Sequence, residues 1–263
     1  MTPASFIDTH CHLTLLEDRG VLDEAMESAR SAGVETMVTI GVDLGDSDRN
    51  RAIAERHDSV WFAVGWDPQQ TRPPDAGELC ALAELLRHPR AVAVGEVGLD
   101  CFFRPGYHDT ALDVQQRSLR TMLELAAEAE KPVVIHDRDA HEEILDALAD
   151  VPGVRGVMHC FTAGAAHMRR CVERGFAVSF SGIVTFPRSE DVQDAARQAP
   201  DDMFVVETDA PFLTPVPHRG TVNMPARIVD TARRVASLRD DTVESVAALT
   251  SANARRIFGL DAH

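Results

Sequence analysis

Short apolar runs alternate with longer amphipathic stretches along the whole chain, and this alternation limits the possible folds more than any other feature. The short runs contain many β-branched residues and have the length of strands. The longer stretches repeat apolar residues at helical spacing, as Leu119, Met122, Leu123 and Ala126 do. The strand-like runs cover residues 5–9, 36–42, 60–65, 91–97, 132–136, 155–160, 176–181 and 203–208.

The helical stretches separate consecutive strand-like runs. They cover residues 19–32, 46–57, 75–88, 110–130, 139–149, 164–174, 189–199, 224–237 and 241–257. Eight strands, each followed by a helix after a short connection, predict an α/β fold, a (β/α)8 TIM barrel, in a single domain over residues 1–263. A doubly wound open sheet has the same local alternation, but the count of eight and the placement of the polar residues described next favour the barrel.

Composition and the first residues exclude several classes of protein. The segment MTPASFIDTH has no basic and apolar leader, and no apolar run approaches the roughly 20 residues of a membrane span, so we expect a cytoplasmic monomer without membrane contact. Five cysteines without a C-x-x-C pair predict reduced thiols. The net charge of −16 argues against a broad, sequence-independent nucleic-acid clamp, although a nuclease can still contact one or two phosphates through metals.

Histidines and carboxylates lie at or near the C-terminal ends of the predicted strands. These residues are His10, His12, Glu96, His136, His159 and Asp209. His10 and His12 are two positions apart, so an extended backbone directs both imidazoles to the same side. A barrel brings the strand ends to one face, where the active sites of this fold lie, so we expect all of these side chains to converge.

Imidazole and carboxylate ligands without thiolate suit divalent Zn, Mn or Mg. The number of ligands exceeds the need of one tetrahedral ion and fits two ions about 3.5–4 Å apart, with a bridging carboxylate and a hydroxide between them. Taken alone, each residue is better explained as a hydrogen-bonded histidine or a capping carboxylate, so the hypothesis depends on the joint pattern. Other histidines lie in helices or loops and are given no metal role: His57, His88, His108, His141, His167, His218 and His263.

At these positions the sequence resembles the TatD family of metal-dependent hydrolases, which are amidohydrolase-like barrels. The matching stretches are FIDTHCHL at 6–13, AVGEVGLD at 93–100, KPVVIHDRDA at 131–140, HCFTAG at 159–164 and ETDAPFLTP at 207–215. The resemblance implies two metal sites, with Glu96 as the bridge, His10, His12 and Asp209 in one site, and His136 and His159 in the other. It further implies that Asp209 accepts a proton from the attacking water, and that the activity is that of a DNase or 3′–5′ exonuclease.

Two loops depart from the family pattern. The family usually has G-x-H-P after the third strand, whereas this chain has G-W-D-P with Asp67 at the histidine position. The family usually has a basic residue before a later N-x-P, whereas Val222 precedes Asn223 here. We expect both loops, including Asp67 and Asn223, to face substrate. Asp67 would repel a phosphate unless it binds a third cation or pairs with Arg72 or Arg138.

Three functions remain open at this point. The first is a phosphodiesterase acting on single-stranded DNA ends, with Arg104, Arg138 and Arg219 binding phosphate. The second is a hydrolase of esters or amides on a small metabolite or aminoacyl group, in which Asp67 recognises an amine. The third is a non-enzymatic binding protein on a decayed barrel, which the presence of every candidate ligand opposes.

Overall fold

The computed structural model describes residues 4–103 and 106–260, and its strands form one parallel eight-stranded sheet in sequence order. The strands are β1 (Phe6–Cys11), β2 (Val34–Ile40), β3 (Val60–Val64), β4 (Ala91–Asp100), β5 (Val133–Arg138), β6 (Gly156–Met158), β7 (Phe176–Phe180) and β8 (Phe204–Val206). β1 and β8 bring the sheet nearly to closure, since the Thr9 hydroxyl donates to the Val206 carbonyl over 3.0 Å and Cys11 forms a parallel bridge with Ala210. The predicted (β/α)8 barrel is confirmed.

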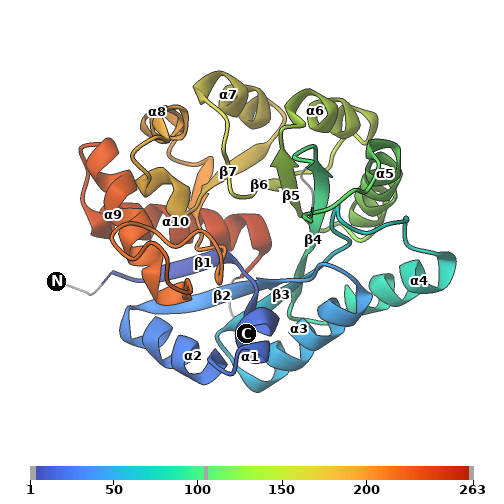
Figure 1. Cartoon of the computed structure of the whole chain (residues 1–263), viewed down its shortest axis with the longest axis horizontal. Helices are drawn as coiled ribbons and strands as arrows, with labels where there is room; N and C mark the ends of the chain where they lie inside the picture. Colours follow the sequence, from blue (N-terminus) through green and yellow to red (C-terminus); the bar gives the residue numbers. More distant parts are fainter. Residues whose placement is uncertain (1–3, 104–105, 261–263) are drawn as a thin grey trace.

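Helices surround the strands as a ring (Figure 1). They are α1 (Leu13–Asp18), α2 (Leu22–Ser31), α3 (Leu44–Arg56), α4 (Ala76–Leu85), α5 (Leu112–Glu128), α6 (His141–Asp150), α7 (Ala165–Glu173), α8 (Glu190–Gln198), α9 (Ile228–Leu238) and α10 (Val243–Phe258), with 3-10 turns η1 (Gly182–Thr185) and η2 (Pro225–Arg227). Side-chain caps define several starts. Asp75 and Glu78 form a reciprocal capping box at α4, and Thr242 caps α10.

The apolar core has two layers. The inner layer takes residues from every strand, including Ile7, Val38 and Val205, and the end of α10 packs against it through Phe258 and Leu260. The outer layer fills the space between strands and helices. This division follows from the alternation of side chains along each strand, and it leaves the C-terminal strand ends for polar groups.

The N-terminal region contains one helix more than predicted. Residues 19–32 were expected to form one helix, and α2 (Leu22–Ser31) lies within that range, but the short α1 (Leu13–Asp18) before it was not expected; Gly20 lies between them at φ 70°. A left-handed backbone at Gly20 costs little because glycine has no Cβ, and it allows the chain to turn between two short helices. The early α1 places His12 directly before its first residue.

Two strands carry register irregularities at candidate ligands. Between Asp8 and Cys11, β1 contains one residue more than the segment of β2 that pairs with it. Between Val94 and Val97, β4 likewise contains one residue more than the paired segment of β5. His10 and Glu96 lie in these two segments. Such bulges redirect side chains and are frequent next to active sites.

Gly65 permits the close approach that positions Glu96. The Glu96 backbone N–H donates to the Gly41 carbonyl over 2.8 Å, so it reaches past β3 to the end of β2. A Cβ on Gly65 would lie 1.9 Å from the Gly41 oxygen and 2.4 Å from the Glu96 nitrogen. Only glycine fits at this crossing.

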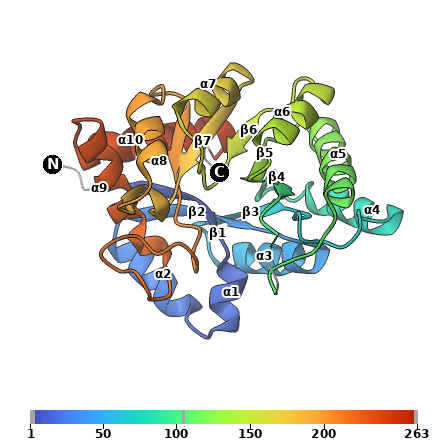
Figure 2. The same ribbon diagram turned by 45° about the horizontal axis from the view of Figure 1, so that its top comes forward.

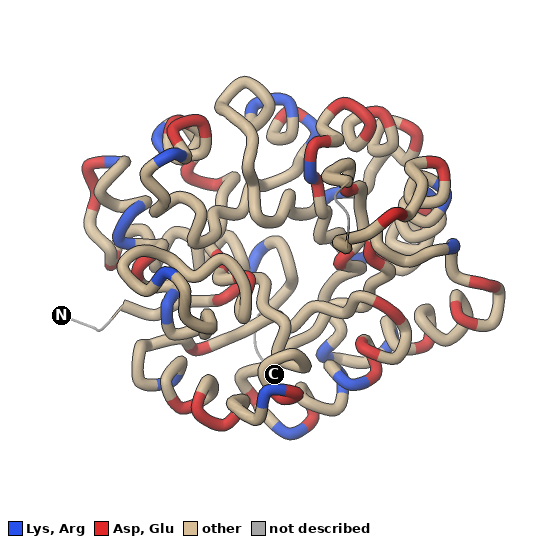
Figure 3. The backbone as a smooth tube through the Cα atoms, viewed as in Figure 1, with Lys and Arg blue, Asp and Glu red and all other residues tan. Residues whose placement is uncertain are grey.

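The segment after β8 folds back over the N-terminal part of the chain, where η2 packs on α2 (Figure 2). Acidic and basic residues are interspersed along the outer helices (Figure 3). The five cysteines are free, as predicted. Among the described residues no helix is long and apolar enough to span a membrane.

Candidate metal centre

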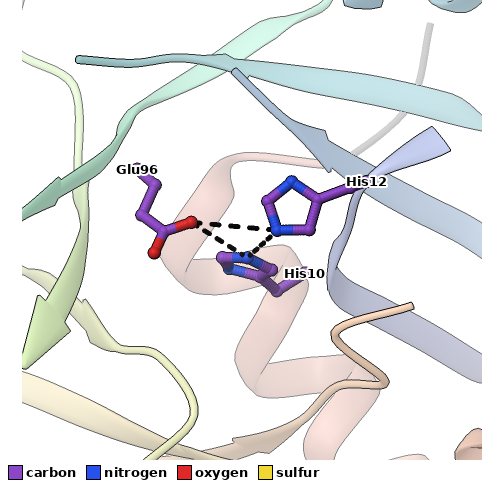
Figure 4. A group of neighbouring side chains, drawn as sticks. All are labelled: His10, His12 and Glu96. Atoms are coloured by element: carbon purple, nitrogen blue, oxygen red, sulfur yellow. Dashed lines mark hydrogen bonds and ion pairs between the residues drawn. The ribbon is translucent and has the colours of Figure 1, made fainter. Parts of the chain in front are cut away.

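The first half of the centre combines the end of β1 with the segment after β8. His10 Nε2 and His12 Nε2 lie 3.3 Å apart, and Glu96 Oε2 is 3.6 and 3.8 Å from them (Figure 4). Asp209 Oδ1 approaches the same two nitrogens at 3.6 and 3.4 Å. Backbone bonds between the segments fix this arrangement: Asp209 N donates to the His10 carbonyl and His12 N donates to the Ala210 carbonyl.

The second half uses the other oxygen of the same glutamate. Glu96 Oε1 lies 2.6 Å from His136 Nδ1 and 3.1 Å from His159 Nε2, and these two nitrogens are 3.1 Å apart. The rings of His10 and His159 stack with centroids 3.9 Å apart, which joins the two halves. Glu96 therefore directs one oxygen to each pair of imidazoles.

The donor set fits divalent ions. A tetrahedral ion with bonds of about 2.0–2.1 Å separates its ligand atoms by roughly 3.3–3.4 Å, close to most of the spacings found here. In each half one pair of imidazole nitrogens faces each other, His10 with His12 and His136 with His159. Only one proton can lie between two such nitrogens, so imidazoles in their neutral form would direct lone pairs to a common point. Hydrogen bonding alone leaves this arrangement poorly satisfied, whereas a cation in each half would use every inward lone pair.

Burial and charge act together on the titratable groups. Burial alone would raise the pKa of Glu96, but the neighbouring histidines hold it well below its usual value. Burial similarly opposes ionisation of Asp209, yet His12 and His10 lower its pKa. His10 moves the other way, since burial and the nearby His159 lower its pKa. At neutral pH both carboxylates are therefore ionised and His10 is neutral, as metal ligands must be.

Comparison with known proteins identifies the family. A family described as TatD related DNase matches residues 7–259. The chain belongs to this family. It is 35% identical to the metal-dependent hydrolase YabD of Bacillus subtilis (strain 168), over 97% of this chain and 99% of the relative.

Other TatD-family relatives agree. A Citrobacter koseri protein named 3′-5′ ssDNA/RNA exonuclease TatD is 32% identical, over 90% of this chain and 93% of its own. The crystal structure of the TatD homologue YJJV from Escherichia coli K12 superposes with a TM-score of 0.91 at 27% identity, covering 99% of this chain and all 100% of that one. The chain is thus a metal-dependent hydrolase of the TatD family.

Two carboxylates that the sequence motifs had not been used to predict, Asp100 and Glu207, contact the outer nitrogens of the candidate ligand histidines. Asp100 Oδ2 lies 3.3 Å from His136 Nε2 and accepts a hydrogen bond from the Tyr107 hydroxyl over 2.9 Å. Glu207 Oε1 lies 3.4 Å from His159 Nδ1 and accepts from Cys160 N over 2.7 Å. Both carboxylates are fully buried. Their places in GLD and ETD, beside candidate ligands, were a signal that could have been used.

Asp67 lies close enough to the centre for its charge to interact with the histidines and Glu96. Burial, followed by the nearby Glu96 charge, raises the pKa of Asp67 to about 7. Its Oδ1 accepts a hydrogen bond from Gln70 Nε2 over 2.9 Å. Arg72, one of the two arginines considered as a partner for Asp67, instead forms an ion pair with Glu78 at 2.6 Å.

The predicted substrate contacts have different surroundings. The Arg138 guanidinium stacks 3.7 Å over the Phe102 ring and donates to the Tyr107 hydroxyl, so it lies on the His136 side of the centre without contacting Asp67. The exposed Arg219 stacks on Phe186 at 4.0 Å. Arg104 lies outside the described residues.

Asn223 contacts its own loop. Its amide donates to the Thr208 and Phe212 carbonyls over 2.9 and 2.7 Å, and its Oδ1 accepts from Met224 N. The residue is 0% exposed. These bonds order the segment that follows Asp209, and they oppose the predicted direct contact of Asn223 with substrate.

Proposed function

We propose that this chain is a 3′–5′ exonuclease that hydrolyses phosphodiester bonds at single-stranded nucleic-acid ends with a pair of divalent ions. The observation that carries this proposal is Glu96, whose two oxygens face separate pairs of imidazoles. His10, His12 and Asp209 would complete one site, and His136 and His159 the other. The relative named as a single-strand exonuclease supports the choice of substrate. The family match over residues 7–259 supports one catalytic domain.

When bound, the ions would supply Lewis-acid polarisation of a phosphoryl oxygen and stabilise the charge that develops on the leaving oxygen. The residues then have separate tasks. Asp209 would accept a proton from the attacking water, because its low pKa keeps the carboxylate ionised at neutral pH. Glu96 and the backbone ladder between β1 and the segment after β8 would hold Asp209 and the imidazoles in place.

Exposed aromatic rings near the centre suit unpaired bases. Phe212 is 45% exposed and its ring lies edge-on to His12, with centroids 5.8 Å apart. Tyr107, 40% exposed, donates to Asp100 behind His136. Each ring offers a face on which a base can stack, and stacking is the usual way to bind single strands without reading their sequence. Arg138 beside Tyr107 would bind phosphate through its guanidinium.

One observation favours an ester or amide hydrolase instead. The carboxyl of Asp67 lies near enough to Glu96, His136 and His12 for their charges to interact, and among the described residues the neutral Gln70 amide is the group that donates to its side chain. A carboxylate in that place would recognise an amine on a small substrate. The same centre would then polarise a carbonyl oxygen.

Turnover on both substrate classes tests the proposal. Metal-loaded protein should shorten single-stranded DNA from its 3′ end, should act much less on duplex DNA, and should stop at a 3′-terminal phosphorothioate. A panel of amine-bearing esters and amides should give little turnover. His218→Gln is a matched surface control, since the His218 side chain is 45% exposed and its ion pair among residues 4–103 and 106–260 is with Asp230 at 3.3 Å. Efficient ester or amide turnover without DNA cleavage would overturn the exonuclease assignment.

A further inference from the structure

A second group of potential metal ligands lies outside the candidate centre, between β5, α6 and α7. It consists of Asp137, His141 and His167, each of which offers one ligand atom within 4.8 Å of the others. Asp137 follows His136 on β5, so the alternation of the strand sends its side chain to the other face, away from Glu96. His141 begins α6 and His167 lies in the first turn of α7. Two consecutive βα units, β5–α6 and β6–α7, thus contribute to one cluster.

The contacts within this group leave hydrogen-bonding capacity unused. Asp137 Oδ2 lies 2.8 Å from His141 Nδ1 and 3.4 Å from His167 Nε2. Among the described residues, His167 Nδ1 and Asp137 Oδ1 are buried without a hydrogen-bond partner, and the 3.4 Å contact with Asp137 is too long for a good hydrogen bond to His167 Nε2. The side chains of Asp137 and His167 are only 7% and 9% exposed. A buried imidazole that is satisfied this poorly is costly, and this cost needs a compensating partner.

Within the part of the chain that the structure describes, neighbouring groups do not supply that partner. The Glu142 carboxylate is held by both terminal nitrogens of Arg170, so it is not available to the histidines. Phe161 stacks parallel to His167 with centroids 6.0 Å apart and offers no polar atom. His141 is 35% exposed at its side chain, which gives the cluster access to solvent. An ion could therefore enter past His141.

We infer that Asp137, His141 and His167 form a separate binding site for a zinc-like divalent ion. Two imidazoles and one carboxylate are a ligand set used by zinc sites that keep a fourth position open. Nitrogen ligands select Zn²⁺ over Mg²⁺, which prefers oxygen. The ion would tie α6 and α7 to β5, the strand that carries His136. This assignment reverses the sequence-based expectation that His141 and His167 have no metal role, and it does not depend on the number of ions in the candidate centre.

Zinc content distinguishes this site from the centre. We would dialyse the wild-type chain, Glu96→Ala, and both proteins with His167→Gln added against buffered Zn²⁺, and measure zinc by elemental analysis. His167→Gln should remove one ion per chain in both backgrounds, whatever the Glu96→Ala background itself retains. His218→Gln should remove none, because the His218–Asp230 pair lacks a third ligand. Equal zinc content with and without His167→Gln would overturn the inference.

Thermal unfolding supplies a readout independent of activity and of the centre. In the Glu96→Ala background, Zn²⁺ at a hundredfold excess over its dissociation constant should raise Tm by about 5–10 °C. Mg²⁺ should not produce this rise, and His167→Gln should abolish it. If His167→Gln does not fold, His141→Gln changes a part-exposed residue and serves the same test. A zinc-induced rise that survives His141→Gln and His167→Gln alike would contradict the site.

Discussion

The two halves of the candidate centre share Glu96 but differ in charge and support. The half formed by His10 and His12 has a carboxylate of its own, Asp209, and is held by backbone bonds between β1 and the segment after β8. The half formed by His136 and His159 has only the shared Glu96, and its support comes from buried carboxylates behind the rings. On the proposed two-metal arrangement, we expect the first half to bind a cation more tightly, because an additional anionic ligand would face the ion.

The largest expected effect tests what the two halves share. Glu96→Ala removes the oxygen that faces each half, so we expect loss of both ions and a fall in DNA turnover of roughly 10³-fold or more. His12→Ala is the matched control, because it touches one half only and should leave one ion. Elemental analysis of both variants would decide. Loss of one ion in each variant would show that Glu96 does not bridge.

Asp209 tests the chemistry of the first half. Asp209→Asn keeps an oxygen ligand but removes the group that accepts a proton, so we expect at least one retained ion and turnover lower by about 10²–10⁴-fold. Single-turnover rates on single-stranded DNA, together with metal content, measure this effect. Turnover near that of the wild type would remove Asp209 from the proton transfer.

Asp100 tests the support of the second half. Burial opposes ionisation, yet the bond to His136 brings the pKa of Asp100 to about 2, which shows how strongly the pair is coupled. Asp100→Asn should weaken metal binding or activity by roughly 10–100-fold, the usual cost of losing a carboxylate behind a ligand histidine. Tyr107→Phe removes a bond to the same carboxylate and should cost less. A larger loss in Tyr107→Phe would place the importance of this loop in substrate contact instead.

Gradual chelation compares the two halves directly. The half that contains Asp209 should release its ion at a higher chelator concentration than the half formed by His136 and His159. Metal content should therefore fall in two steps, each of about one ion per chain. In His159→Ala the first step should disappear, while in His10→Ala the remaining ion should leave early. A single step of two ions in the wild type would show that the halves bind with equal strength or only as a pair.

Substitution of Asp67 has the smallest expected effect on stability and activity. The charges of residues from both halves act on its carboxyl group. Its pKa near 7 is raised above the ordinary value, so the folded metal-free protein binds more protons than the unfolded chain between about pH 4 and 7, and its stability falls as pH rises across that window. Asp67→Asn should flatten this slope. Asp67→His should lower the apparent KM for DNA by replacing a carboxylate with a donor. Urea unfolding across pH and steady-state kinetics measure these effects, and unchanged values in both would restrict Asp67 to its loop bond with Gln70.

The apolar periodicity of the sequence predicted much of the fold, and the features that it missed are few. The alternation of strand and helix patterns was correct in order and number of strands, because apolar periodicity follows from which face of each element is buried. Helix α1 (Leu13–Asp18) was missed because a helix of one to two turns is too short to show a clear apolar period. The β1 and β4 irregularities at His10 and Glu96 were not predictable, since register depends on the neighbouring strand.

The sequence by itself determined the barrel and the set of polar residues at its strand ends, because parallel strands in a closed barrel deliver those ends to one face. It also carried the motifs that match the TatD family. Only the tertiary structure decided which atoms meet. It turned one oxygen of Glu96 to each half, gave Asp67 the partner Gln70, and brought Asp137, His141 and His167 together from two consecutive βα units. These contacts depend on rotamers, bulges and helix placement, which long-range packing sets and local sequence does not.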